Sequence, residues 1–203
     1  KFFSIIAHDL RSPFTGFIGL TNMMSENISD FTIDELSNIS KNLNTSAKNL
    51  FQLLNNLLEW SSIHRGMMKY NPVEINLMSL FQKCLDDEKE IINNKEIKII
   101  TKIDNKILVF ADMQMLETIN RNLISNAVKF SNHNGVISID VDYYDKDFLK
   151  VSVNDNGIGM NKELLSKLFK IQEVVNRKGT EGELSSGIGL LLCKEFVNKH
   201  NGL

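Results

Sequence analysis

Apolar residues recur at alternating steps of three and four through most of the first 64 residues, and this spacing constrains the fold more than any other feature. Such steps keep side chains on one face of a helix and are typical of helices that pack side by side. A polar segment, 25–31, separates two such stretches, so the pattern predicts an antiparallel hairpin of two long helices. The seam positions are Phe3, Ile6, Leu10, Pro13, Phe17, Leu20 and Met24, then Leu36, Ile39, Leu43, Ser46, Leu50, Leu53, Leu57, Trp60 and His64.

The start of the second helix and the width of the apolar stripes add two further expectations. Thr32 and Glu35 form a capping-box sequence, so the helix is expected to begin just after Thr32. Four more apolar residues widen the stripes beyond one two-helix contact, namely Phe2, Phe14, Leu54 and Leu58. A second copy of the chain would cover them in a dimeric four-helix bundle, and a helix from elsewhere in a longer parent protein is the alternative.

After Gly66 the helical period gives way to shorter, mixed elements. We therefore expect a helical domain at 1–68 and a second domain at 69–203. The second domain is expected to be an α+β sandwich with an antiparallel-rich sheet. The expected elements are helices at 77–94, 112–131 and 188–200, another helix beginning near Asn161, and strands at 97–103, 107–111, 135–144 and 148–155.

Composition excludes several classes of function. A formal net charge of −2 leaves no positive excess for nucleic acid, and no apolar run reaches the roughly 18 residues of a membrane span. Cys84 and Cys193 stand apart from any histidine cluster, so both are expected to be reduced thiols in a cytoplasmic domain without membrane contact. Because the chain begins at Lys1 without Met, we interpret it as part of a longer protein, whose parent is compatible with an inner-membrane anchor.

The most distinctive motif is VNDNGIGM, residues 153–160. A strand is expected to end at Asp155, and Gly157 and Gly159 let the backbone turn where side chains would block a flat ligand. A buried carboxylate there can accept a hydrogen bond from an exocyclic amine such as that of adenine. An ordinary turn after a strand has the same composition, so this motif alone leaves both interpretations open.

Two more segments favour a nucleotide. Asn122, Asn126 and Lys129 share one helical face, which suits a cation-bridged polyphosphate, although a solvated helix face has the same spacing. Gly187 and Gly189 stand at the start of the last helix, where free N–H groups attract phosphate. The preceding loop has the composition of a mobile lid, and the chain has no P-loop motif. The small residues of that loop are Gly179, Thr180, Gly182, Ser185 and Ser186.

Taken together, these motifs resemble those of the sensor histidine kinases. The N-x-x-x-N-x-x-K helix, the D-x-G-x-G strand end, Phe169 and the glycine-rich helix entry are similar in order and spacing to that family's N, G1, F and G2 boxes. The opening HDLRSP, residues 8–13, resembles its H box, and GLLLCKEFVNKH is similar to hybrid sensors of the family. The resemblance spans essentially the whole chain and implies a dimeric helical hairpin followed by an ATP-binding sandwich of the GHKL type.

The resemblance also implies roles for individual residues. Asp155 would hold adenine, Asn126 would coordinate Mg²⁺, and Asn122 and Lys129 would support the metal and the phosphates. The implied function is an autokinase that transfers the γ-phosphoryl group of ATP to His8 and then to an aspartate of a response regulator receiver domain. The other residues implied to surround the nucleotide are Phe130, Gly157, Gly159, Phe169, Thr180, Gly187, Ile188, Gly189 and Leu190.

Three features depart from the family pattern. Ser185 replaces the first glycine of G-x-G-x-G, which puts the geometry of the preceding loop in question. Phe130 replaces a common tyrosine, so the ring is kept and the hydroxyl is lost. The chain stops at HNGL, before the strands with which the family finishes its sheet, so the catalytic domain is expected to be truncated at its C-terminus.

His8 is expected on the outer face of the first helix. With Leu10 at heptad position a and Ile6 at d, His8 falls at f, directed away from the seam. A neutral imidazole is a competent nucleophile, and we expect Asp9 to accept its Nδ1 proton while Nε2 attacks the γ-phosphorus. Pro13 is expected to bend or loosen the helix and so to relay an upstream signal.

The remaining polar residues of interest have weaker expectations. By the resemblance, Ser12 would position water for removing the phosphoryl group from a partner's aspartate, although serine does this less readily than Thr or Asn. The other histidines are expected to be structural, with His64 packed in the seam, His133 in a solvated loop, and His200 complementing the dipole at a helix end.

Two alternative functions remain. The related ATPases place a glutamate four residues before the metal-binding asparagine, and here that position is Asn122, which has no base to activate water. This substitution and the H box favour a kinase over a GHKL-type ATPase. A dimeric scaffold with a vestigial nucleotide site is the other alternative.

Overall fold

The computed structural model describes residues 2–170, 177–183 and 187–203, and the side chains of residues 2–9, 12 and 64 lie outside that description. The chain divides into two compact units, Lys1–Met67 and Met68–Leu203, which are considered one at a time below. No helix among the described residues is long and apolar enough to cross a bilayer.

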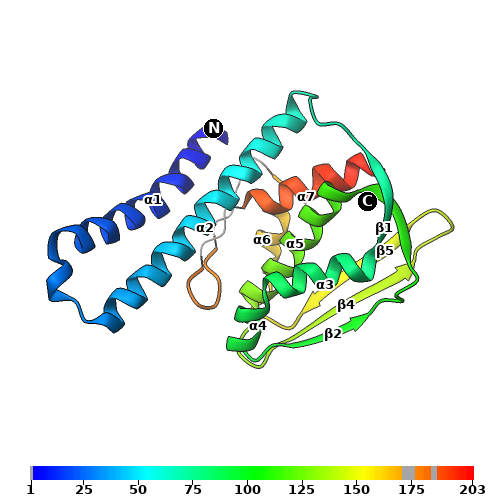
Figure 1. Ribbon diagram of the computed structural model, residues 1–203. Helices are drawn as coiled ribbons and strands as arrows, with labels where there is room; N and C mark the ends of the chain where they lie inside the picture. Colours follow the sequence, from blue (N-terminus) through cyan, green and yellow to red (C-terminus); the bar gives the residue numbers. More distant parts are fainter. Residues whose placement is uncertain (1, 171–176, 184–186) are drawn as a thin grey trace. The chain divides into compact units, whose positions relative to one another are not determined.

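The first unit is a helical hairpin (Figure 1). Helix α1 (Phe2–Asn27) is followed by a short 3-10 turn, η1 (Ile28–Asp30), and by helix α2 (Ile33–His64). The predicted capping box is confirmed, because the Glu35 N–H donates to the Thr32 hydroxyl (3.3 Å) and the Thr32 N–H donates to the Glu35 carboxylate (2.8 Å). These two bonds satisfy amide groups that have no partner within the helix.

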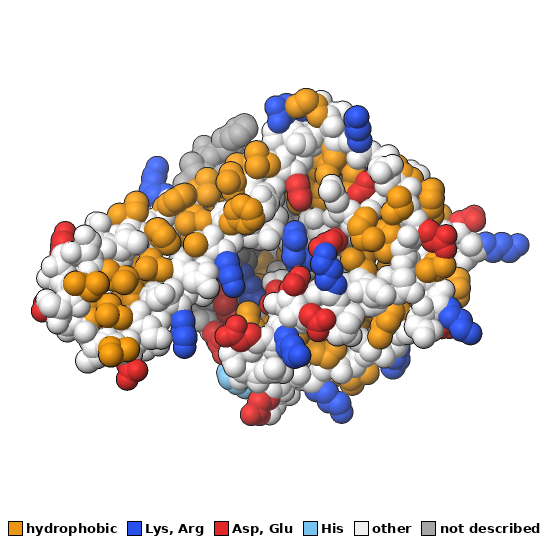
Figure 2. Space-filling view, in the orientation of Figure 1, with side chains coloured by type: hydrophobic (Ala, Val, Ile, Leu, Met, Phe, Trp, Pro, Cys, Tyr) orange, Lys and Arg blue, Asp and Glu red, His pale blue; other side chains and the backbone are white. Residues whose placement is uncertain are grey.

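The predicted seam is confirmed as the least exposed stripe of the hairpin. Every seam position with a described side chain is half-buried or buried, from Leu10 to Met24 in α1 and from Leu36 to Trp60 in α2. The apolar residues beside the seam stay exposed, with Phe14 at 48% and Leu58 at 54% of their full exposure. Figure 2 shows such apolar side chains gathered along the hairpin surface. Among the apolar residues described in the hairpin, therefore, the seam is the stripe that is most buried.

Pro13 does not end helix α1, which continues for another 14 residues to Asn27. Proline has no N–H, so the helix lacks the bond that residue 13 would donate to the carbonyl of residue 9. Two residues further on, the Thr15 hydroxyl donates to the Arg11 carbonyl at 2.8 Å, an arrangement that often accompanies bending. The predicted bend and signal relay stay a hypothesis.

The second unit contains two small sheets among its described residues. Strands β1 (Pro72–Asn76) and β3 (Leu108–Asp112) pair antiparallel. Strands β2 (Lys98–Lys102), β4 (Val136–Tyr143) and β5 (Leu149–Asp155) form a second sheet in the order β2-β4-β5. The β2–β4 pair is parallel and the β4–β5 hairpin is antiparallel. The strands predicted at 135–144 and 148–155 are thus confirmed, and Asp145 Oδ1 closes the turn between them by accepting the N–H groups of Asp147 and Phe148.

Five helices accompany the sheets in the described part of this unit. They are α3 (Leu77–Asp87), α4 (Lys89–Asn94), α5 (Met113–Phe130), α6 (Lys162–Lys167) and α7 (Ile188–Lys199). Helices α3 and α5 cover one face of the three-stranded sheet (Figure 1). The core between them includes Phe81, Ile124, Ile137 and Ile139, all fully buried. Helix α7 packs on α5 and buries Phe196 and Leu192.

Two expectations about this unit were wrong. The helix predicted at 77–94 is two helices separated at Glu88, because three consecutive acids, residues 86–88, oppose the negative end of the first helix dipole. No strand was expected at residues 72–76, which form strand β1. A proline is tolerated as the first residue of such a strand, so Pro72 marks its beginning.

Candidate nucleotide-binding site

Helix α5 carries the three polar residues expected to face a nucleotide. Its start is fixed by Asp112, whose Oδ1 accepts the N–H groups of Gln114 and Met115, both at 3.1 Å. Asn122, Asn126 and Lys129 are half-buried, whereas Ile124, Ala127 and Val128 are buried in the core. The helix therefore presents one polar face, held in place by the apolar face behind it.

The two carboxamides on this face have different surroundings. Asn122 Nδ2 donates to the Thr118 carbonyl at 2.8 Å, and a Cβ added at Gly189 would overlap Asn122 Oδ1. Gly189 thus lets the first turn of α7 approach α5 closely. The side chain of Asn126 has no hydrogen-bond partner among the described residues. Its amide oxygen suits a hard cation such as Mg²⁺.

Lys129 has a perturbed ammonium group. Burial lowers its pKa from 10.5 to about 8, and the nearby Glu183 carboxylate partly opposes that change. Its Nζ lies 5.7 Å from the centre of the Phe130 ring. Arg177 approaches the same ring from the loop after α6, at 5.8 Å, and also donates to the Gly159 carbonyl. Two cations therefore gather at Phe130, which is where an anionic ligand would be attracted.

The end of β5 meets the end of α5 through the backbone. Asp155 was expected to be buried but is exposed, because it lies at the end of its strand. Its Oδ1 accepts the Gly157 N–H at 3.0 Å, and the Ile158 N–H donates to the Phe130 carbonyl at 3.1 Å. A Cβ at Gly157 would overlap that carbonyl, so only glycine allows this approach. Gly159 has φ +57°, a backbone conformation that other residues rarely adopt. The adjacent depression is lined by Ile158, Gly159, Asn161, Glu163, Leu164, Lys167 and Arg177.

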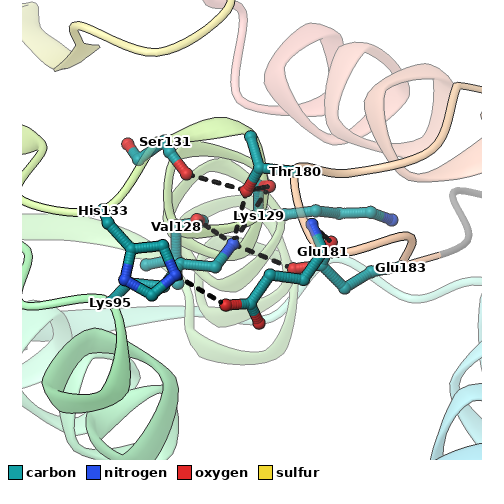
Figure 3. A network of polar contacts seen from close by, with 8 residues as sticks. All are labelled: Lys95, Val128, Lys129, Ser131, His133, Thr180, Glu181 and Glu183. Atoms are coloured by element: carbon teal, nitrogen blue, oxygen red, sulfur yellow. Dashed lines mark hydrogen bonds and ion pairs between the residues drawn. The ribbon is translucent and has the colours of Figure 1, made fainter.

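Residues 179–183 also join the end of α5 (Figure 3). The Thr180 N–H donates to the Lys129 carbonyl at 3.1 Å, and the Thr180 hydroxyl lies 2.9 Å from the Ser131 carbonyl. Thr180 was expected beside the nucleotide, but in this structure its hydroxyl is engaged within the protein. Ser185 and Ser186 of the same expected lid lie outside the described residues.

Sequence reasoning missed Lys95, which lies just after α4. Its side chain is fully buried, and its Nζ contacts Thr180 Oγ1 (2.8 Å), Glu183 Oε1 (3.0 Å), and the Val128 and Lys129 carbonyls (3.2 and 3.3 Å). A lysine in a polar stretch gives no sequence signal of burial. Arg177 and Glu183 were missed as well, because a charged residue in a polar segment gives no sequence signal of the contacts that it makes.

The remaining expected residues are more peripheral. Phe169 is half exposed, and Lys194 Nζ lies 5.5 Å from its ring centre. Gly187 adopts φ +63° immediately before α7, Ile188 is fully buried, and Leu190 is half-buried. Helix α7 thus begins with a left-handed residue that directs its first N–H groups outward from a buried turn.

The histidines outside the hairpin differ from expectation in detail. His133 is exposed, but its Nε2 lies 3.1 Å from Glu181 Oε1. His200 was expected to complement the dipole at the end of α7. Its Nε2 accepts the Asp112 N–H at 3.0 Å, and its Nδ1 lies 2.7 Å from the Phe196 carbonyl in the last turn of α7. His200 therefore ties the end of α7 to the start of α5.

The H-box residues lie in helix α1, and the side chains of His8, Asp9 and Ser12 are outside the described part of the structure. The backbone register of α1 is continuous from Phe2, so His8 is at the heptad position opposite the half-buried seam. Cys84 and Cys193 are both buried free thiols, and burial raises the pKa of Cys84 to about 11.

Two family profiles match the chain in the order of its two units. "His Kinase A (phospho-acceptor) domain" matches residues 1–66, and "Histidine kinase-, DNA gyrase B-, and HSP90-like ATPase" matches residues 111–203. The chain belongs to the sensor histidine kinases. The kinase therefore combines a phosphoacceptor hairpin with an ATP-binding domain, as the resemblance implied.

Individual relatives agree with this assignment. The sensor histidine kinase GacS of Pseudomonas protegens is 24% identical over 208 residues, which cover 100% of this chain and 22% of that protein. Histidine kinase AdeS of Acinetobacter baumannii has a similar fold, with a TM-score of 0.73 at 20% identity over 94% of this kinase and 86% of that chain. ThkA, in its complex with the response regulator TrrA, has a TM-score of 0.66 at 24% identity over 97% of this kinase and 54% of that chain. The chain thus spans about a fifth of its curated relative.

Proposed function

We propose that the kinase is an ATP-dependent autokinase that phosphorylates its own His8 and passes the phosphoryl group to an aspartate of a response regulator receiver domain. The observation that carries this proposal is the meeting of three motif segments at the end of α5. The Phe130 carbonyl is bound by Ile158 of the G1 segment, and the Lys129 carbonyl is bound by Thr180. The polar face of α5 and the glycine turns are thereby held together in one place.

The residues present fit a nucleotide with a divalent cation. Gly157 keeps the space beside Phe130 free of a side chain, and the unpartnered Asn126 carboxamide offers an oxygen to a hard cation. In the proposal Asn126 holds Mg²⁺, Lys129 contacts phosphate, and Asp155 accepts the adenine amine through the oxygen that Gly157 does not bind. When bound, Mg²⁺ neutralises charge on the phosphates.

The transfer itself requires a nucleophile from the hairpin. In the proposal, Asp9 accepts the Nδ1 proton of His8, and Nε2 forms a bond to the γ-phosphorus of ATP. The bond from that phosphorus to the bridging oxygen breaks, and ADP leaves with the electron pair. Asn122 supports this direction of reaction, because its carboxamide bonds Thr118 and cannot act as a base for water.

A radiolabel experiment separates this proposal from its two alternatives. The chain is incubated with γ-labelled ATP and Mg²⁺, beside His8→Gln and, as a control histidine on the other hairpin helix, His64→Gln. We expect acid-labile label on the wild type and on His64→Gln, and none on His8→Gln. Free phosphate without protein label would indicate a GHKL-type ATPase. Nucleotide binding without either product would indicate a scaffold, and both outcomes contradict the autokinase.

The proposed partners are a second copy of the chain, bound through residues 1–68, and a receiver domain. The exposed apolar residues beside the seam, such as Phe51 and Leu58, support the dimer because a four-helix bundle would bury them. The complex of ThkA with TrrA supports a receiver as the second partner. Sedimentation should show a dimer, and adding a receiver domain should move label from the kinase to its aspartate. We place the parent protein in the cytoplasm or at the inner membrane.

Ser12 carries a secondary proposal, since it follows His8 by one helical turn on the same face. If Ser12 positions water for dephosphorylation, Ser12→Ala should slow loss of phosphate from a phosphorylated receiver and leave autophosphorylation unchanged. Equal rates of phosphate loss for the two proteins would remove this role.

A further inference from the structure

The Lys95 ammonium is fully buried, yet no expected motif includes it. A buried ammonium needs an acceptor for each of its three protons, and an unpaired one is strongly destabilising. Lys95 meets this need with four acceptors between 2.8 and 3.3 Å. Each proton of the Lys95 ammonium therefore has an acceptor, and the four acceptors show which segments Lys95 joins (Figure 3).

Two of the four acceptors belong to the last turn of α5. The carbonyls of Val128 and Lys129 have no partner within the helix because the helix ends at Phe130. Lys95 contacts both, and its positive charge complements the negative end of the helix dipole. Lys95 thus completes the end of the helix that carries Asn126 and Lys129.

The other two acceptors belong to the segment 179–183. Thr180 Oγ1 and Glu183 Oε1 lie 2.8 and 3.0 Å from Lys95 Nζ. Burial raises the pKa of the Glu183 carboxyl, but backbone hydrogen bonds and the bond from Lys95 together hold it below its usual value. A Cβ at Gly179 would overlap the Glu183 carboxylate and lie 2.7 Å from Lys129 Cγ, so glycine lets this segment close against α5. The segment and the helix end are therefore joined by one ion pair in a tight space.

We propose that Lys95 is a positioning residue for nucleotide binding: it fixes segment 179–183 against the end of α5 and thereby sets the backbone that carries Lys129. The inference rests on the proposed ATP-binding function. Lys95 itself contacts no substrate. Its effect passes through the Lys129 carbonyl, which both Lys95 Nζ and the Thr180 N–H bind.

The test compares Lys95→Met with a matched control pair in the same unit. Lys83 and Glu117 form an ion pair of 2.8 Å between α3 and α5, but the Lys83 side chain is 60% exposed. We expect Lys95→Met to raise the Kd for MgATP, and the apparent KM for ATP in autophosphorylation, by tenfold or more. Lys83→Met should change both by less than twofold.

A positioning defect and a folding defect differ in their effects on KM and on the amount of labelled protein at saturating ATP. A variant with an irreversibly unfolded fraction loses labelled protein at saturating ATP while its KM stays constant. Reversible unfolding would itself raise the apparent KM, so circular dichroism must first show that the free variant is as folded as the wild type. A positioning defect raises KM and leaves the labelled amount at saturation close to the wild-type value. Hydrogen exchange gives a second readout, because the Thr180 amide should exchange faster in Lys95→Met than the amides at the core of α5.

Glu183→Gln keeps the proposal testable if Lys95→Met does not fold. Glu183→Gln keeps an acceptor but removes the charge, so a three- to tenfold rise in KM is expected. Where both single variants fold, the variant that carries Lys95→Met and Glu183→Gln together should raise KM by less than the product of the two single effects. Both substitutions remove the same contact.

The proposed positioning role is overturned if folded Lys95→Met or Glu183→Gln binds MgATP as tightly as the wild type. It is also overturned if the loss appears only as a smaller labelled fraction. Failure of the proposed function looks different, since the wild type itself would then bind no MgATP.

Discussion

The two units of this kinase differ in how much of their apolar surface a single chain can bury. The hairpin keeps a half-buried seam and leaves large residues such as Phe51 and Leu54 at 65% and 45% exposure. The α/β unit buries Phe81, Ile124 and Ile137 completely between helices and sheet. A two-layer sandwich closes its own core, whereas a two-helix hairpin covers only one stripe. A single chain thus leaves apolar residues of the first unit exposed, whereas the second unit closes its own core.

The largest expected effect comes from the core of the α/β unit. Phe81→Ala should lower the free energy of unfolding by about 3–5 kcal/mol, because it removes a buried ring and leaves a cavity. Leu54→Ala on the exposed side of α2 should cost under about 1 kcal/mol in dilute protein. Urea unfolding followed by far-UV circular dichroism measures both. An equal loss for Leu54→Ala that grows with protein concentration would show that a second copy covers this stripe.

Replacing a glycine by alanine should change the free energy of unfolding in opposite directions in the two units. Gly157→Ala places a Cβ against the Phe130 carbonyl, so we expect a loss of about 1–3 kcal/mol and at least tenfold weaker MgATP binding. Gly16→Ala, in the exposed interior of α1 with no atom near the new Cβ, should stabilise the hairpin by about 0.5–1 kcal/mol. Calorimetric titration and urea unfolding report both effects. Unchanged nucleotide binding in Gly157→Ala would contradict the assignment of the site.

The pKa of Lys129 predicts how nucleotide binding depends on pH. Burial lowers this pKa to about 8, so the positive charge is present below that pH and is lost above it. MgATP affinity should fall about tenfold between pH 7 and 9. The unfolded chain holds this proton more tightly, so the free energy of unfolding should rise with pH between about 8 and 10.5. Lys129→Arg should flatten the binding profile, and a flat wild-type profile would exclude a phosphate contact by this ammonium.

The smallest expected effect concerns the start of α2. Thr32→Ala removes one side of the capping box and should destabilise the hairpin by about 1 kcal/mol. Thr45→Ala, at an exposed position inside the same helix, should be neutral or slightly stabilising. Trp60 is the only tryptophan of the chain and lies in α2, so its fluorescence reports hairpin unfolding. Equal unfolding midpoints for Thr32→Ala and Thr45→Ala would show that the capping box adds nothing measurable to the stability of the hairpin.

Regular elements were predicted wherever local spacing determines them. The seam of the hairpin, the capping box and the strands β4 and β5 all follow from residues fewer than eight positions apart. Strand β1 was missed because its partner, β3, lies some 35 residues later and its sequence begins with Pro72. The split of α3 from α4 depends on three acids near the end of α3. Their effect on a helix end is too weak to predict a break, so tertiary packing decides where α3 ends.

The site shows the same division. The sequence by itself indicated which residues we propose for nucleotide binding, because Asn126, Lys129, Asp155 and the glycines occupy fixed local spacings on one helix, one strand end and one helix entry. Only the tertiary structure decided that a buried Lys95 joins Val128 to Glu183, residues 33 and 88 positions away. It also decided that His200 joins the end of α7 to the start of α5, because the Asp112 N–H reaches its Nε2. Local spacing fixes which face of an element a side chain occupies, whereas long-range hydrogen bonds arise only when separate segments meet.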